Sequence, residues 1–217
     1  MDAWGRPAQW GAMGLDAARL HAGIACVAAR APAVAAALAR AGFPQPRIRD
    51  RGYATLLRII LGQQVSVCAA EAMWARFAAA AASPAEPAAL LALPDTVLRA
   101  CGFSRQKAAY ARALAEAVAT GAIDLAALPA DDEAAIRVLT GLKGIGRWSA
   151  EIYLLFAEGR PDVFPAGDLA VRIELGRVLG LDARPSEAAA RALAEDWRPH
   201  RGAMAVFLWH HYQTAVF

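Results

Sequence analysis

The chain has 217 residues, which is long enough for one large or two small domains with a sizeable core, so it need not oligomerise to be stable. Its net charge of +3 permits contact with a polyanion but does not demand it. No charge-free apolar run approaches the ~20 residues that cross a bilayer. The first residues also lack a basic segment followed by an apolar core, so a secretory signal is not predicted. We expect a monomeric, cytoplasmic protein.

The three cysteines, Cys26, Cys68 and Cys101, lie far apart and form no CxxC pair. This pattern indicates neither a disulfide framework nor a zinc site. We expect these thiols to be reduced and mostly buried.

Alanine mixed with leucine, arginine and glutamate predicts a mostly helical protein, and no window alternates in the way that predicts a sheet. The first fifteen residues are expected to form an arm or a short turn. Asp16 is a candidate N-cap for the first helix, and Gly42 is a stop signal for the second. In chain order, helices are predicted over 16–30, 32–41, 52–61, 66–81, short segments within 83–96, then 104–120, 131–141, 147–158, 168–179, 186–198 and 199–214.

A hairpin, Leu142-Lys143-Gly144-Ile145-Gly146, joins two of these predicted helices. Its glycines let backbone N–H groups turn outward at a helix N-terminus, where unpaired donors and the helix dipole favour a phosphate. Such a contact ignores base sequence. On its own, a GxG before a helix is more often an ordinary turn, and its place ahead of Trp148 and Asp168 is what favours the phosphate contact.

The segment after the hairpin leads to Asp168 in a Phe-Pro-Ala-Gly-Asp turn. The intervening helix of about twelve residues would span roughly 18 Å, which places Asp168 well away from a phosphate held at the hairpin. One element would then hold the DNA backbone while another works on a base. The alternative, which is compatible with this one, is that Asp168 is the N-cap of the following helix.

Four stretches, in order, resemble the helix-hairpin-helix (HhH-GPD) DNA glycosylases, and within them the alkylation-repair branch, 3-methyladenine DNA glycosylase II. The resemblance covers 50–217 and implies an all-α fold in which two helical lobes flank a cleft for DNA and base. One lobe would be 52–165, with the hairpin motif at about 131–158, and the other 1–51 together with 166–217. The stretches are LLRIILGQQVSVCAA at 56–70, LRACGFSRQKAAYARALAEAV at 98–118, LKGIGRWSA and DVFPAGD.

The resemblance implies a base excision repair enzyme that flips 3-methyladenine and 7-methylguanine from duplex DNA and hydrolyses the N-glycosidic bond. Asp168 would be its catalytic carboxylate, and Asp162 a structural residue. Relatives that also cut the strand carry a nucleophilic lysine directly after the hairpin arginine, where this chain has Trp148 after Arg147, so no lyase activity is expected. Some relatives hold an iron–sulfur cluster on four cysteines near the C-terminus. No cysteine follows Cys101, so no such cluster is expected.

The resemblance also assigns the remaining site residues. Gln63 or Gln64, with Gln64 preferred, would be the wedge that fills the gap left by the flipped nucleotide. A structural monovalent metal ion on the hairpin carbonyls is the one ion implied, when DNA is bound, and no other cofactor is expected. Phosphate contacts would come from Leu142, Lys143, Gly144, Ile145, Gly146 and Ser149, and the base pocket from Trp148, Tyr53, Tyr153 and His200.

The sequence departs from the branch at His200, where the best-known member carries a tryptophan, which leaves the lesion range open. Trp209, His210 and His211 are expected to be packing or surface residues. Two other functions stay open: a glycosylase of the same fold for deaminated or oxidised bases, and a noncatalytic DNA-binding protein that keeps the hairpin. Asp168 argues against the second, because a pure binding module has no need of it.

Overall fold

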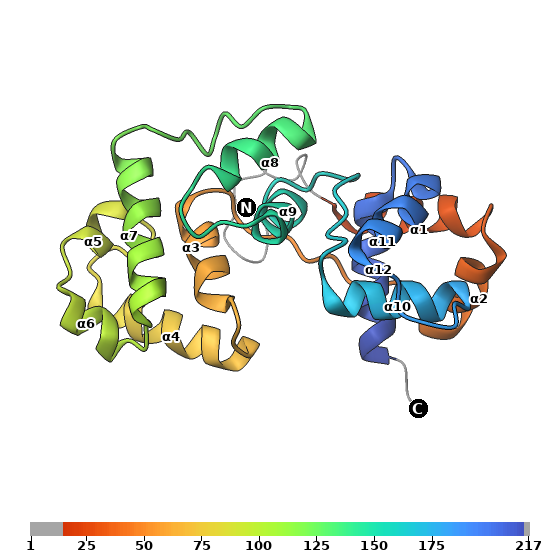
Figure 1. Ribbon diagram of the computed structural model, residues 1–217, viewed down its shortest axis with the longest axis horizontal. Helices are drawn as coiled ribbons and strands as arrows, with labels where there is room; N and C mark the ends of the chain where they lie inside the picture. Colours follow the sequence, from red (N-terminus) through yellow and green to blue (C-terminus); the bar gives the residue numbers. More distant parts are fainter. Residues whose placement is uncertain (1–14, 215–217) are drawn as a thin grey trace. The chain divides into compact units, whose positions relative to one another are not determined.

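The computed structural model describes residues 15–214, and within them it contains helices and no strand (Figure 1). The predicted all-helical fold is therefore confirmed. The helices are α1 (Ala17–Ala28), α2 (Pro32–Ala41), α3 (Tyr53–Gly62), α4 (Val67–Ala80), α5 (Pro87–Leu91), α6 (Asp95–Ala100), α7 (Arg105–Ala119), α8 (Asp132–Thr140), α9 (Arg147–Phe156), α10 (Leu169–Leu179), α11 (Glu187–Leu193), the 3-10 helix η2 (Ala194–Trp197) and α12 (Arg201–Thr214). The arm predicted for the first fifteen residues lies, except for residue 15, outside the described part.

Short polar side chains begin many of these helices. Asp16 accepts a hydrogen bond from the backbone N–H of Arg19 at 2.8 Å, as its predicted capping role requires. Gly42 ends α2 with φ +70, a left-handed conformation that favours glycine. Both predictions are confirmed. The same N-terminal cap geometry recurs at Ser66, Ser104, Asp131 and Ser186.

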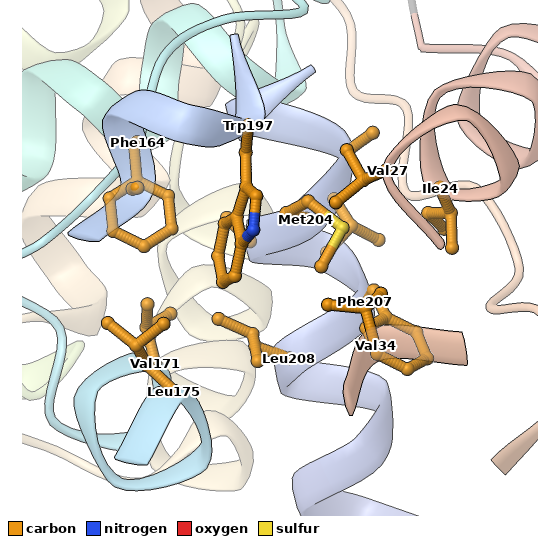
Figure 2. Packing of buried hydrophobic residues seen from close by; sticks show 14 of the residues in the cluster. Ile24, Val27, Val34, Phe164, Val171, Leu175, Trp197, Met204, Phe207 and Leu208 are labelled. Atoms are coloured by element: carbon orange, nitrogen blue, oxygen red, sulfur yellow. The ribbon is translucent and has the colours of Figure 1, made fainter. Parts of the chain in front are cut away.

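The chain divides into two compact units, one combining the residues up to Ile48 with those from Leu154 onward, the other Arg49–Tyr153. In the first unit α12 packs against α1, α2 and α10. Figure 2 shows the apolar core that these helices share with the segment before α10. Residues 154–165, which the sequence had placed in the central lobe, belong to the first unit. The reason is that Leu155 and Phe164 are buried in its core.

In the second unit α7 lies against α3, α5 and α6, and α3 also packs on α4 (Figure 1). Its core is formed by fully buried side chains from each of these elements. The core residues include Leu56, Leu57, Ile60, Phe77, Leu90, Leu98 and Leu114.

No helix in the described part of the chain is long and apolar enough to cross a membrane.

The cysteines differ in their surroundings. Cys101 is buried, and burial raises the pKa of its thiol. Cys26 and Cys68 are exposed, so the prediction that the cysteines are mostly buried is wrong for these two. Both lie on the outward faces of helices whose other faces supply the apolar contacts. Among residues 15–214, no group of three or more His, Cys, Asp or Glu side chains could hold a metal ion.

Candidate functional site

The hairpin between α8 and α9 has a conformation that only glycine fits at one position. Gly144 has φ +90, and a Cβ built on it would lie 2.2 Å from Cγ of Tyr110 on α7. Ile145 is buried and anchors the hairpin in the core, while Lys143 and Gly146 on either side are exposed. The backbone at the tip is therefore held against α7 and turned toward solvent.

The end of α3 is bonded to the hairpin through Gln63. Its Nε2 donates to the carbonyl oxygen of Gly144 at 2.9 Å and to Oγ of the buried Ser149 at 3.1 Å. Lys107 of α7 donates through Nζ to the carbonyl oxygen of Leu61, and burial lowers the pKa of Lys107. A cation at the C-terminal end of a helix is favourably placed for the helix dipole. These bonds fix the last turn of α3 relative to the hairpin.

The two glutamines predicted as wedge candidates have different environments. The Gln63 amide is engaged with the hairpin, as described above. Gln64 is exposed, and it is the only non-glycine residue with positive φ in the described part of the chain, at +57. A left-handed conformation at a non-glycine residue is uncommon and costs energy, which makes it a candidate for function. Of the pair, Gln64 has the side chain that is presented to solvent.

Arg147, the first residue of α9, joins the two helices of the motif. It bonds to Glu133 of α8 through two guanidinium nitrogens, and its Nε donates to Oε1 of the buried Glu151 at 3.0 Å. The hydrogen bond that Arg147 donates to Glu133 is the largest cause of its raised pKa. The arginine after the hairpin is thus occupied in holding α8 and α9 together.

A groove of about 690 Å³ runs along the hairpin. The described residues that line it include Lys143 and no carboxylate, so its charge favours an anion. The N–H groups in the first turn of α9 have no acceptor four residues earlier within the helix, so they can donate to such an anion. A metal cation at the hairpin would instead be coordinated by neutral carbonyl and hydroxyl oxygens, and such ligands suit a monovalent cation better than a divalent one. The lining residues are Gln63, Gln64, Gln106, Tyr110, Thr140, Gly141, Leu142, Lys143, Gly144, Ile145, Gly146, Trp148 and Ser149.

The aromatic residues predicted for the base pocket in the second unit differ in their exposure. Trp148 is 37% exposed and lines the hairpin groove. Tyr153 is fully buried, and its hydroxyl accepts from the backbone N–H of Gly52 at 2.8 Å. Tyr53 is also buried; burial raises its pKa, and its hydroxyl oxygen has no hydrogen-bond partner among residues 15–214. Trp148 is the one of these three aromatic residues with an exposed face beside the hairpin.

Asp168 lies at the N-terminus of α10, where two donors meet on one of its oxygens. The backbone N–H of Val171 donates to Oδ1 at 3.0 Å, and Nε1 of Trp209 donates to the same Oδ1 at 3.1 Å. Asp168 is therefore the N-cap of α10, as the alternative interpretation predicted. Trp209 also packs against Phe156, with ring centroids 5.5 Å apart. The sequence predicted packing for Trp209 but missed its bond to the carboxylate.

His200 lies at the start of α12, and Trp209 lies further along this helix. His200 precedes the first turn of α12, nine residues before Trp209, which corresponds to roughly 13 Å along a helix. Its ring packs on α1, where a Cβ on Gly23 would lie 3.2 Å from Nδ1 of His200. Of the aromatic side chains on or beside α12, it is Trp209 that contacts the carboxylate.

The loop that leads to Asp168 is anchored by α12. The buried Arg201 binds Asp162 bidentately, with Nε to Oδ1 at 3.0 Å and Nη2 to Oδ2 at 2.9 Å. The N–H of Gly202 donates to the carbonyl oxygen of Pro161 at 2.7 Å, and a Cβ on Gly202 would also approach that oxygen to 2.7 Å. Asp162 thus has the structural role that the sequence predicted. The loop is held at its start by these bonds and at its end by the cap of α10.

Comparisons with known proteins agree with this geometry. The model of the HhH-GPD superfamily base excision DNA repair proteins matches residues 57–199. A Bacillus subtilis relative is 28% identical over 165 residues, which span 72% of this chain but only 58% of that protein. The DNA-3-methyladenine glycosylase 1 of Schizosaccharomyces pombe is 34% identical over 161 residues, covering 72% of this chain and 71% of the relative.

A solved structure of the 3-methyladenine DNA glycosylase of Schizosaccharomyces pombe, in complex with abasic DNA, is similar to this chain with a TM-score of 0.74. The two are 31% identical, and the similarity covers 82% of this chain and 89% of that one. The chain belongs to the HhH-GPD superfamily of base excision DNA repair proteins, in the branch of the DNA-3-methyladenine glycosylases.

Proposed function

We propose that the protein is a monofunctional DNA glycosylase that removes 3-methyladenine and 7-methylguanine from duplex DNA and leaves an abasic site. The observation that carries the proposal is the Asp168 carboxylate, which is fixed at the N-terminus of α10 by the N–H groups of Val171 and Trp209. The names of its relatives, one of them solved with abasic DNA, support 3-methyladenine as a substrate and an abasic site as the product.

The chemistry asks little of the protein because methylation leaves the purine with a positive charge. When the bond between C1′ and the base nitrogen breaks, its electron pair neutralises the base and positive charge develops on the deoxyribose. The negative charge of Asp168 stabilises that charge and orients the attacking water. The water oxygen bonds to C1′ and its proton is lost to the carboxylate or solvent. A carboxylate held in place before reaction has no reorganisation to perform during it.

Binding would be divided among elements of the second unit. The hairpin groove would hold a backbone phosphate through the first-turn N–H groups of α9 and through Lys143, independently of base sequence. Gln64, exposed and already in a left-handed conformation, would fill the gap left by the flipped nucleotide. Trp148 offers an exposed aromatic face for an electron-poor base.

The nucleophile would be water and not an amine. Trp148 follows Arg147 at the position where strand-cutting relatives carry lysine. Lys143 belongs to the hairpin groove, where a phosphate contact is the role that its position supports. Borohydride should therefore trap no covalent complex between the protein and DNA that contains the lesion.

The test is base release from methylated duplex DNA, with the freed bases separated chromatographically. We expect wild type to release 3-methyladenine and 7-methylguanine. Asp168→Asn should release neither base and still bind DNA. The matched control is Asp182→Asn, the same chemical change at an exposed aspartate of the first unit, which should behave like wild type.

Two results would contradict the proposal. Release of alkylated bases by Asp168→Asn would exclude this carboxylate as the catalytic group. If wild type releases neither base, duplexes containing hypoxanthine or an oxidised purine should be tried next. Release from one of these would establish a glycosylase for another class of lesion, and binding without any release would establish a noncatalytic DNA-binding protein.

A further inference from the structure

Tyr110 of α7 lies in the hairpin groove although it belongs to neither helix of the hairpin motif. Its ring is seated on the backbone of Gly144: a Cβ at that glycine would come within 2.2 to 2.7 Å of three ring carbons. The ring is therefore fixed relative to the hairpin, and the space it occupies is the reason that residue 144 must be glycine.

The hydroxyl of Tyr110 has a donor to offer. Nε2 of Gln106, one turn earlier on α7, donates to the phenolic oxygen at 2.6 Å. A phenol both accepts and donates. Because its oxygen accepts the amide N–H, its own proton must point away from Gln106. No acceptor for that proton is found among residues 15–214.

The surroundings determine what kind of acceptor would fit. The described lining of the groove includes the exposed Lys143, the hairpin backbone and no carboxylate, so a negatively charged acceptor meets no repulsion there. The only anion that the proposed function brings to this groove is the DNA backbone. A phosphate oxygen accepts well from hydroxyl groups, and tyrosine is among the side chains that contact phosphates in protein–DNA complexes.

We propose that Tyr110 is a further phosphate-binding residue, whose hydroxyl donates to the DNA strand held at the hairpin while Gln106 orients it. This inference rests on the proposed DNA-binding role of the hairpin. It makes α7 part of the DNA-binding surface, so the grip has two elements. The contact is neutral, and it therefore adds affinity without adding to the release of counterions from DNA.

The test is the affinity of Tyr110→Phe for an undamaged duplex, measured by fluorescence anisotropy at several salt concentrations. The substitution keeps the ring on Gly144 and removes only the hydroxyl. Loss of one hydrogen bond to a charged acceptor should weaken binding about tenfold. The slope of log Kd against log salt should stay that of wild type. By contrast, Lys143→Gln should reduce that slope by about one.

Two further variants keep the test interpretable. Tyr212→Phe makes the same change at an exposed tyrosine on α12 and should bind like wild type. Gln106→Ala leaves the ring untouched and frees the hydroxyl to rotate, so a smaller loss of affinity is expected. The unfolding midpoint of each variant should match that of wild type.

Unchanged affinity in Tyr110→Phe would overturn the inference, as would an equal loss in Tyr212→Phe or a reduced salt slope in Tyr110→Phe. The outcome is independent of catalysis. If wild type releases no base but Tyr110→Phe still weakens DNA binding at an unchanged slope, the glycosylase proposal fails and the role of Tyr110 stands.

Discussion

Replacing Asp168 by asparagine and by alanine should separate its capping role from its catalytic role. Asparagine is as good an N-cap as aspartate, and its amide oxygen can accept from both Val171 N–H and Trp209 Nε1. Alanine loses the cap, which costs about 1 kcal/mol. It also leaves the half-buried indole N–H without its acceptor, which costs about 1 kcal/mol more.

We therefore expect Asp168→Ala to lower the free energy of unfolding by about 2 kcal/mol, which for a chain of this size shifts the melting temperature by about 4 to 8 °C. Asp168→Asn should stay within about 0.5 kcal/mol of wild type, since it keeps the cap. Both variants should lose base release by at least about a hundredfold, because neither carries the charge that stabilises the sugar in the transition state.

Thermal unfolding followed by circular dichroism, together with base release under single-turnover conditions, measures the two effects on the same preparations. The reasoning is refuted if the two variants are equally destabilised, since the hydrogen bonds would then not be what Asp168 contributes. It is also refuted if base release follows stability, with Asp168→Asn nearly active, because the carboxylate would then be only a cap.

Three further predictions concern the residues that build the site. Trp209→Phe should slow base release about tenfold with DNA binding unchanged, because one hydrogen bond to a charged group is lost; Phe156→Leu, which removes only the ring contact, should retain the rate of wild type. Gly144→Ala should disrupt the hairpin, since φ is +90 and the space is filled, whereas Gly146→Ala, with nothing within 4 Å of its Cβ, should fold normally and weaken binding to all DNA sequences alike. Normal DNA binding by the latter variant would contradict the hairpin assignment. Arg201→Met should destabilise the protein by about 3 kcal/mol, measured by urea unfolding, because Asp162 loses its two hydrogen bonds to a buried cation and keeps only the more exposed Arg198 as an ionic partner.

The helices were predictable because their signals are local. Asp16 and Gly42 each mark a helix end through their own chemistry, and the structure places those ends within one residue of the prediction. Helix bounds elsewhere differ by one to a few residues, most at α11, where the final turn is a 3-10 helix. The hairpin and the Asp168 turn were likewise recognisable from contiguous residues.

The contacts within the site were not predictable because they join residues that are distant in the sequence. Trp209 bonds to a carboxylate 41 residues earlier, and no spacing rule relates an indole to a helix cap at that separation. Gln63 reaches a carbonyl 81 residues later. It is identical in type to its neighbour Gln64, which is exposed and has a left-handed backbone, and nothing in the residue types distinguishes the two.

The position of Asp168 is over-determined by two different kinds of contact, which explains how one residue can be both a cap and a catalyst. The buried ion pair of Arg201 with Asp162 and the bond from Gly202 fix the start of the loop on α12. The donors from α10 and α12 then meet on the single oxygen Oδ1. Because a carboxylate is planar, holding one oxygen from two directions also sets the direction of the other. The bonds that stabilise the helix therefore orient the charge in advance of the reaction, and electrostatic stabilisation of a developing charge requires that preorganisation.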